Sequence, residues 1–235
     1  MRRRTVSLAL ALAAVALGVL VASAAALTPP AGTPNLALMT IQPSDLAAGA
    51  KPVLSAYATA PKNFAAAYDR NYASAKTSSG VALFGLNSQV LLAKTEGAAK
   101  GYFALERSIY RSKSGRRLLA KAIAQSSFNK GVAITVVGFG AFRSLGVGTQ
   151  SLLQTMTLKV RGVRATADFI VLRVGSVVTS VTLLLINSKR SLAVAKQLAG
   201  DVADHIAAVL SPTGPTGTTG ASGTTGTSGT TGATG

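Results

Sequence analysis

The chain contains no cysteine and a single histidine, and its 7 acidic residues stand against 24 lysines and arginines. The absence of cysteine excludes a disulfide, a thiolate nucleophile and a zinc site with cysteine ligands. A fold without disulfides has to be held together by its core alone. The composition, which is 48% hydrophobic, can bury a sizeable core, and one globular domain is the expected count.

The shortage of acidic side chains leaves a formal net charge of +17 at pH 7. A charge of this sign concentrates anionic partners near the protein, and the resulting binding weakens as salt screens it. The candidate partners are acidic polymers of a cell envelope, anionic lipids of a membrane surface, and nucleic acid. Nucleic acid is the least expected, because Tyr102, Phe103 and Tyr110 recur at core spacing and do not predict a stacking platform for bases. The alternative is that the charge mainly supports solubility.

The first 26 residues predict a signal peptide. Three arginines at positions 2–4 precede an almost unbroken apolar run over 6–21, and small residues at 22–26 suit cleavage near Ala24 to Ala26. We therefore expect a secreted or envelope-associated protein. The alternative is an uncleaved N-terminal anchor, because the apolar run approaches the roughly 20 residues that span a bilayer. Residues 27–35 are rich in proline and predict a linker, so the globular domain is expected over 36–210.

The pattern over Leu152 to Ile186 predicts an antiparallel meander of three strands. Met156, Leu158 and Val160 alternate with polar residues, as in a half-buried strand, and a break at Gly162 opens a second strand. Two residues, Gly175 and Ser176, then suit a tight turn into a third strand. We expect the rest of the domain to cover the apolar face of this sheet.

Three stretches predict helices. Thr95 is placed as an N-cap before an amphipathic run to Tyr110, a second helix is expected from Ser114 to about Ala124, and a third from about Ser188 to Leu210. Further strands are expected over 81–93 and 133–139. The pattern does not distinguish helix from strand over 36–41, 53–59 and 64–72. A glycine-rich connection is expected over 138–148. The fold class is therefore α+β, an antiparallel β-sheet packed with helices as an α-β-α sandwich.

Residues 211–235 predict a disordered tail. Every third residue from Gly214 to Gly235 is glycine, which is the spacing that a collagen triple helix requires. Only Pro212 and Pro215 pre-set the extended conformation, so we expect a flexible, threonine-rich tail rather than a trimerising stalk. The oligomeric state stays open.

The order of several short motifs resembles a known group of proteins. A Ser44-Asp45-Leu46 turn, the Tyr68-Asp69-Arg70 stretch, a Leu145-Gly146 turn and Arg173-Val174-Gly175 follow one another along the chain. In this order they resemble secreted actinobacterial proteins similar to the extracellular sensor domains of serine/threonine kinases, and more distantly the PsbP-like and Mog1-like sandwich. The resemblance implies a central antiparallel sheet with helices on it and a binding or sensing role. A kinase segment is absent, so signalling in cis is not expected.

Basic residues cluster in the predicted helical region. Six of them fall between positions 107 and 121 with no acidic residue among them: Arg107, Arg111, Lys113, Arg116, Arg117 and Lys121. Lys113, Arg117 and Lys121 repeat every four residues, which places them on one helical face. This face predicts an anion-binding site, because arginines bind phosphate and carboxylate groups bidentately. The alternative is an ordinary solvated helix surface.

The single histidine is a second, weaker candidate for a functional site. Asp201 and His205 lie one helical turn apart and form a weak candidate metal pair or a solvated surface pair. No G-x-S-x-G motif occurs, and the glycines of 138–148 do not match a dinucleotide fingerprint. We therefore expect no metal and no cofactor.

These observations favour a non-catalytic binding or sensor-like protein of the cell envelope. Its ligand is expected to be an anionic polymer or lipid on the basic face, or a small apolar ligand between sheet and helix. The main alternative is a structural or adhesive protein that acts through its Gly-X-Y tail, and a hydrolase is the third.

Overall fold

The computed structural model describes residues 27–128, 134–186 and 191–211. The predicted signal peptide and all of the predicted tail except Ser211 lie outside these residues. The described helices are the short 3-10 turns η1 (Leu36–Met39) and η2 (Pro43–Asp45) and the α-helices α2 (Glu96–Arg111), α3 (Lys113–Phe128) and α4 (Ser191–Leu210). None of the helices in the described ranges has the length and apolarity to cross a membrane.

Seven strands form one antiparallel sheet in the order β1-β2-β5-β9-β8-β7-β6. In this order their bounds are Leu54–Ala58, Phe64–Tyr72, Gly85–Ala93, Val177–Ile186, Val163–Val174, Gln150–Val160 and Ile134–Arg143. A separate two-stranded sheet joins β3 (Ala75–Lys76) and β4 (Ala82–Leu83). The strands β1 and β6 are therefore the edges of the large sheet.

The predicted meander is confirmed as β7, β8 and β9. Arg161 and Gly162 connect β7 to β8 with φ angles of 48° and 83°, and Gly175 connects β8 to β9 with a φ of 57°. Two-residue hairpin turns have positive φ at both central residues or at the first of them, and glycine adopts it at little cost. The alternation in β7 buries Met156 and Leu158 fully.

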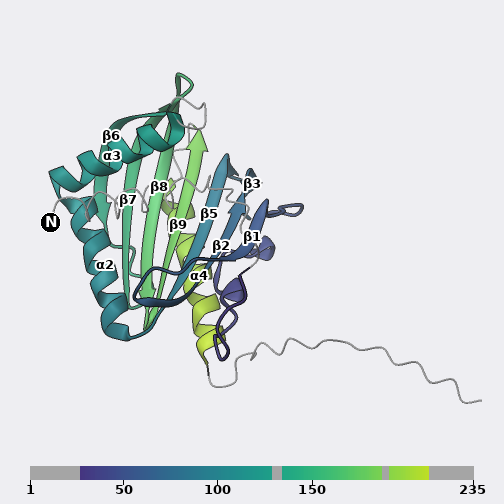
Figure 1. Cartoon of the computed structure of the whole chain (residues 1–235). Coiled ribbons are helices and arrows are strands. Elements are labelled where there is room, and N and C mark those ends of the chain that lie inside the picture. Colours follow the sequence, from purple (N-terminus) through teal and green to yellow (C-terminus); the bar gives the residue numbers. More distant parts are fainter. Residues whose placement is uncertain (1–26, 129–133, 187–190, 212–235) are drawn as a thin grey trace, which may run out of the picture.

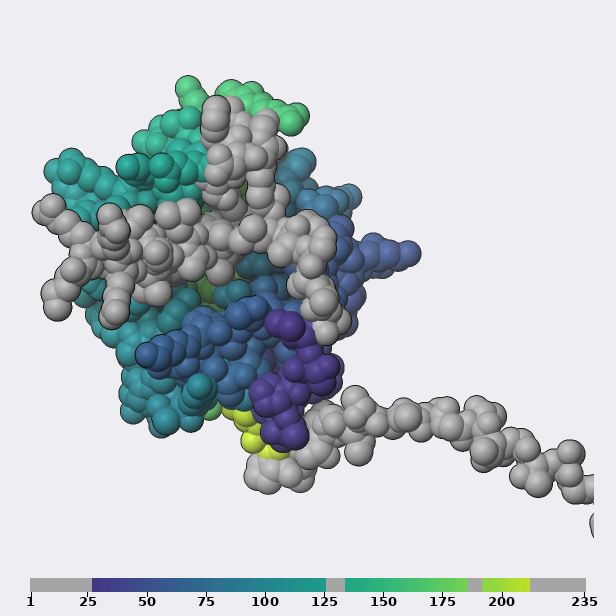
Figure 2. Space-filling model, in the orientation of Figure 1, coloured from purple at the N-terminus to yellow at the C-terminus, as the bar shows by residue number. Residues whose placement is uncertain are grey.

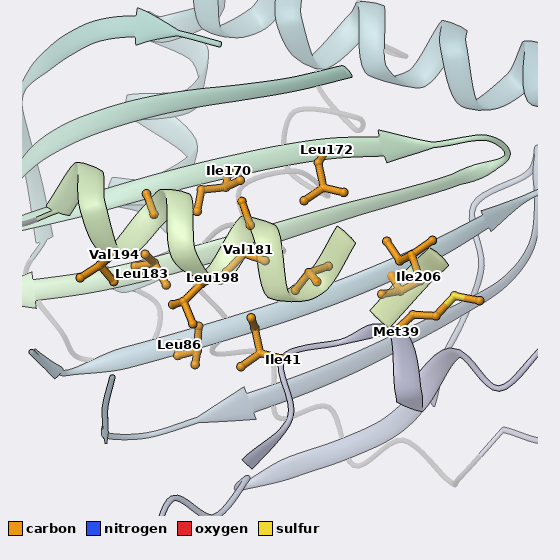
Figure 3. Close-up of a cluster of buried hydrophobic side chains, with 14 of the residues drawn as sticks. Met39, Ile41, Leu86, Ile170, Leu172, Val181, Leu183, Val194, Leu198 and Ile206 are labelled. Carbon is orange, nitrogen blue, oxygen red and sulfur yellow. The ribbon is translucent and has the colours of Figure 1, made fainter. Parts of the chain in front are cut away.

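Helices cover the sheet on both sides, so the predicted α-β-α sandwich is confirmed (Figure 1). Helix α4 and η1 pack on one face, where Val194, Leu198, Val202 and Ile206 recur at helical spacing. Figure 3 shows Leu198 beside Val181 of β9 and Leu86 of β5, and Ile206 beside Met39 of η1. Helices α2 and α3 pack on the other face, where a second buried cluster forms around Phe103.

A sharp corner joins α2 to α3. Thr95 caps α2 as predicted, since its side chain accepts a hydrogen bond from the Ala98 N–H at 3.1 Å. Ser112 ends α2 and also caps α3, because its Oγ accepts from the Gly115 N–H at 3.0 Å. A Cβ at position 115 would lie 2.7 Å from Ile109 Cα, so the corner needs glycine there.

Several predicted boundaries were wrong. The stretch 138–148 is not one connection, because β6 continues to Arg143 through two irregularities at Val136/Gly138 and Phe139/Phe142. Glycine is tolerated in a strand where a bulge interrupts the ladder. The strand expected over 81–93 is divided into β4 and β5. The second helix continues beyond Ala124 to Phe128. In the stretch 36–41, which the sequence left open between strand and helix, residues 36–39 form a 3-10 turn.

The packing of α4 generates a stability prediction. Leu198→Ala should lower the free energy of unfolding by about 2–5 kcal/mol, because it opens a cavity at a position with no exposed surface. Urea unfolding followed by circular dichroism measures the change. Leu192→Ala on the same helix is the matched control, because Leu192 is 36% exposed and should cost far less. Equal losses in the two variants would contradict the packing described for α4.

Candidate functional site

The six basic residues predicted as an anion site lie on both sides of the α2–α3 corner. Arg107 and Arg111 end α2, and the other four belong to α3. All of them are exposed except Arg116, which is half-buried. In Figure 2 the surface of these helices forms the teal region at the left of the molecule, and the strands β1 and β3 lie on the opposite side. We call this surface the basic face.

Two arginines of the basic face are positioned by aromatic rings of the edge strand β6. The Arg111 guanidinium lies 5.9 Å from the centre of the Phe142 ring, and the Arg116 guanidinium lies 5.7 Å from the centre of the Phe139 ring. Stacking on a ring restricts a guanidinium while leaving N–H groups at its edge available. The sequence did not predict these contacts, because they join residues of different elements and the second half of β6 lies in the stretch expected to be a connection.

A cavity opens beside Arg107. Its volume is 240 Å³, and its lining is made by Phe103, Arg107, Phe142, Ser144, Thr149, Gln150, Ser151 and Leu152. Ser151 fixes the neighbouring loop, since its Oγ accepts a hydrogen bond from the Val147 N–H at 3.1 Å. The cavity has one cationic wall, several hydroxyl and amide groups and an apolar base. This lining suits a small acidic group.

The basic face is not neutralised by acidic neighbours. In the described parts of the chain, no carboxylate lies within 4.0 Å of any of its six cationic groups. The ion pairs among the described residues lie elsewhere: Glu96 contacts Lys100 and Arg173, each at 3.1 Å, and Asp45 contacts His205 at 2.9 Å. The uncompensated charge therefore faces solvent, where an anionic ligand can reach it.

Glu106 lies next to Arg107 in sequence but points into the core. Its side chain is buried, and burial raises the pKa of this carboxyl to about 7, although a hydrogen bond with Tyr102 lowers it in part. Its Oε2 atom has no hydrogen-bond partner among the described residues. Glu106 is directed away from the basic face, so its carboxyl does not compete with a ligand for these arginines.

The histidine has a different partner from the one predicted. His205 Nε2 lies 2.9 Å from Asp45 Oδ2 and 3.1 Å from Asp45 Oδ1, which ties α4 to η2. Asp201 is close to both groups, and its pKa is raised by burial and by the negative charge of Asp45. Within the described ranges there is no group of three or more side chains able to hold a metal, so the pair Asp201 and His205 is not extended into a metal site.

Sequence reasoning missed a group of polar side chains on the sheet. They come from β2, β5 and β9, on the face that carries α2, and we call them the polar grid: Asp69, Asn71, Asn87, Gln89, Ser180 and Thr182. Gln89 Nε2 donates to Asp69 Oδ1 at 2.8 Å, and Asn87 Nδ2 donates to Asn71 Oδ1. Polar residues two positions apart in 69–71 and 87–89 were the available signal, because such residues share one face of a strand.

The comparisons with known proteins give one structural likeness. No family model and no curated protein matches the chain. The chain is similar to the crystal structure of the extracellular domain of PknH from Mycobacterium tuberculosis, at 11% identity. The similarity covers 66% of this chain and 82% of that one, with a TM-score of 0.35.

Glu106 generates a prediction about pH. The unfolded chain releases this proton near the ordinary pKa of 4.5 and the folded chain only near 7, so the native state binds more protons between these values. The contribution of Glu106 to stability is therefore lost as the pH rises from 4.5 to 7. Glu106→Gln should remove this loss and stabilise the protein by roughly 3 kcal/mol above pH 7.

Urea unfolding of wild type and Glu106→Gln at several pH values tests this. The two proteins should have similar stability at pH 4.5 and diverge as the pH rises, so the low-pH measurement is the internal control. A difference that does not change with pH would show that the carboxyl titrates normally in the folded state.

Proposed function

We propose that this protein is an exported, non-catalytic binding protein of the cell envelope that binds an acidic polymer through the basic face. The observation that carries this proposal is the set of six cationic side chains without an acidic neighbour, together with the cavity beside Arg107. Successive acidic groups of a polymer bind along α3, and one of them enters the cavity.

A polymer fits this surface better than a lipid bilayer does. Binding at a bilayer surface uses apolar side chains that insert beside the basic ones. Here Phe139 and Phe142 lie beneath guanidinium groups, and Leu118 is the large apolar side chain of α3 that is exposed, at 44%. Stacked arginines instead provide fixed N–H donors for phosphate or carboxylate groups.

The experiment measures binding of the secreted protein to inorganic polyphosphate over a salt series. Binding should weaken steeply as salt rises, and Arg107→Glu/Arg117→Glu should reduce affinity at least tenfold, because it replaces two attractive charges with repulsive ones. The matched control is Lys51→Glu/Lys76→Glu, which changes the net charge equally on exposed residues near β1 and in β3, on the opposite side of the molecule (Figure 1). The control should retain most of the affinity.

Vesicles of phosphatidylcholine, with and without phosphatidylglycerol, form the second arm. The proposal expects little binding to either vesicle at a salt concentration where polyphosphate still binds. Binding to the anionic vesicles alone would replace the polymer with a membrane surface. Equal losses in the two double variants would mean that net charge, and not the basic face, governs binding.

A further inference from the structure

The polar grid has a regular geometry. Strand pairing places its members in two neighbouring rows, and residues opposite one another in adjacent strands lie about 4.5–5.5 Å apart with side chains on the same face. The rows are Asp69–Gln89–Ser180 and Asn71–Asn87–Thr182. Six amide, hydroxyl and carboxylate groups therefore project together from the middle of the sheet.

This arrangement is costly in a sheet face that packs against helices. Asn87 is only 6% exposed, yet its Oδ1 atom has no hydrogen-bond partner among the described residues, and neither does the buried Oγ of Ser180. A buried polar atom left without a partner loses its hydrogen bonds to water and gains none in return, which destabilises the folded state. Apolar residues at these positions would avoid the cost, so the grid is better explained by a partner that supplies the missing hydrogen bonds.

The chemistry of the grid selects the ligand class. Amide and hydroxyl groups both donate and accept hydrogen bonds, as the hydroxyls of a sugar do. The grid contains no lysine or arginine to balance an anion, and its one carboxylate already accepts from Gln89. The rows continue on β8 as Val171 and Phe169, which are buried beneath α2 and end the polar grid on that side.

The position of the polar grid also excludes a peptide ligand that pairs with the sheet as an additional strand. The strands β2, β5 and β9 are interior, and their backbone groups are used by neighbours on both sides. A ligand on this face has only side chains to contact, and β-strand addition needs a free sheet edge. Asp69 and Ser180 are half-buried and the other four residues of the grid are buried, so the row Asp69–Gln89–Ser180 is the less buried of the two.

We infer that the polar grid is a second binding site, independent of the basic face, and that it takes a neutral saccharide. The sugar hydroxyls bond to the Asn87 Oδ1 and Ser180 Oγ atoms, and to the amide of Gln89. The site recognises uncharged hydroxyl groups, whereas the basic face recognises acidic groups. Each site can therefore be removed without the other.

The test titrates the full-length secreted protein with arabinose, galactose, glucose, mannose and maltose, up to about 50 mM, and follows binding by NMR chemical shifts. At least one sugar should bind saturably. Ser180→Ala should weaken that binding about threefold to tenfold, the range expected for one lost hydrogen bond. Asn87→Leu should weaken it at least tenfold.

Two controls separate this inference from a folding defect and from the proposed function. Ser180→Ala removes an atom that has no partner in the described protein, so its urea midpoint should equal or exceed that of wild type. Arg117→Gln should leave sugar binding unchanged, and Ser180→Ala should leave polyphosphate binding unchanged. The inference is overturned if no sugar of the panel binds, or if both grid variants bind as wild type does.

Discussion

The fold depends on the burial of both faces of its central strands. In β8, Ile170 faces α4 and the neighbouring Phe169 faces α2, and they are 0% and 2% exposed. Antiparallel sheets commonly leave one face to water, but a strand that is apolar on both sides requires two covering layers. The helices α2, α3 and α4 provide these layers. The positions of the basic face and of the polar grid follow from how these helices meet the sheet.

Local patterns in the sequence predicted most of the central fold. Alternation in β7, the turn residues Gly162 and Gly175 and the Thr95 cap depend on neighbours a few residues away, and each is confirmed. Phe64–Tyr72 could not be resolved, because interior strands lose the alternation that distinguishes a strand from a helix. The bulges of β6 hid its continuation from residue 139 to Arg143, since glycine in a sequence indicates a turn more often than a bulge.

The two surfaces differ in how far sequence could predict them. The basic face was found because its residues are close in sequence and their charges are of one sign. The rings that position it come from β6, and the polar grid draws residues from 69 to 182, so neither follows from local spacing. His205 pairs with Asp45, which is 160 residues away in sequence. Local spacing could therefore suggest only the nearby Asp201 as its partner.

The shared cap at Ser112 has a consequence for how this chain can change in evolution. One side chain ends α2 and opens α3, so the corner contains no spare residue in which an insertion could be absorbed. Each residue added there would turn α3 by about 100° about its axis, because an α-helix has 3.6 residues per turn. A single insertion would rotate Arg116 away from Phe139. Relatives of this chain should therefore keep a constant spacing across the corner.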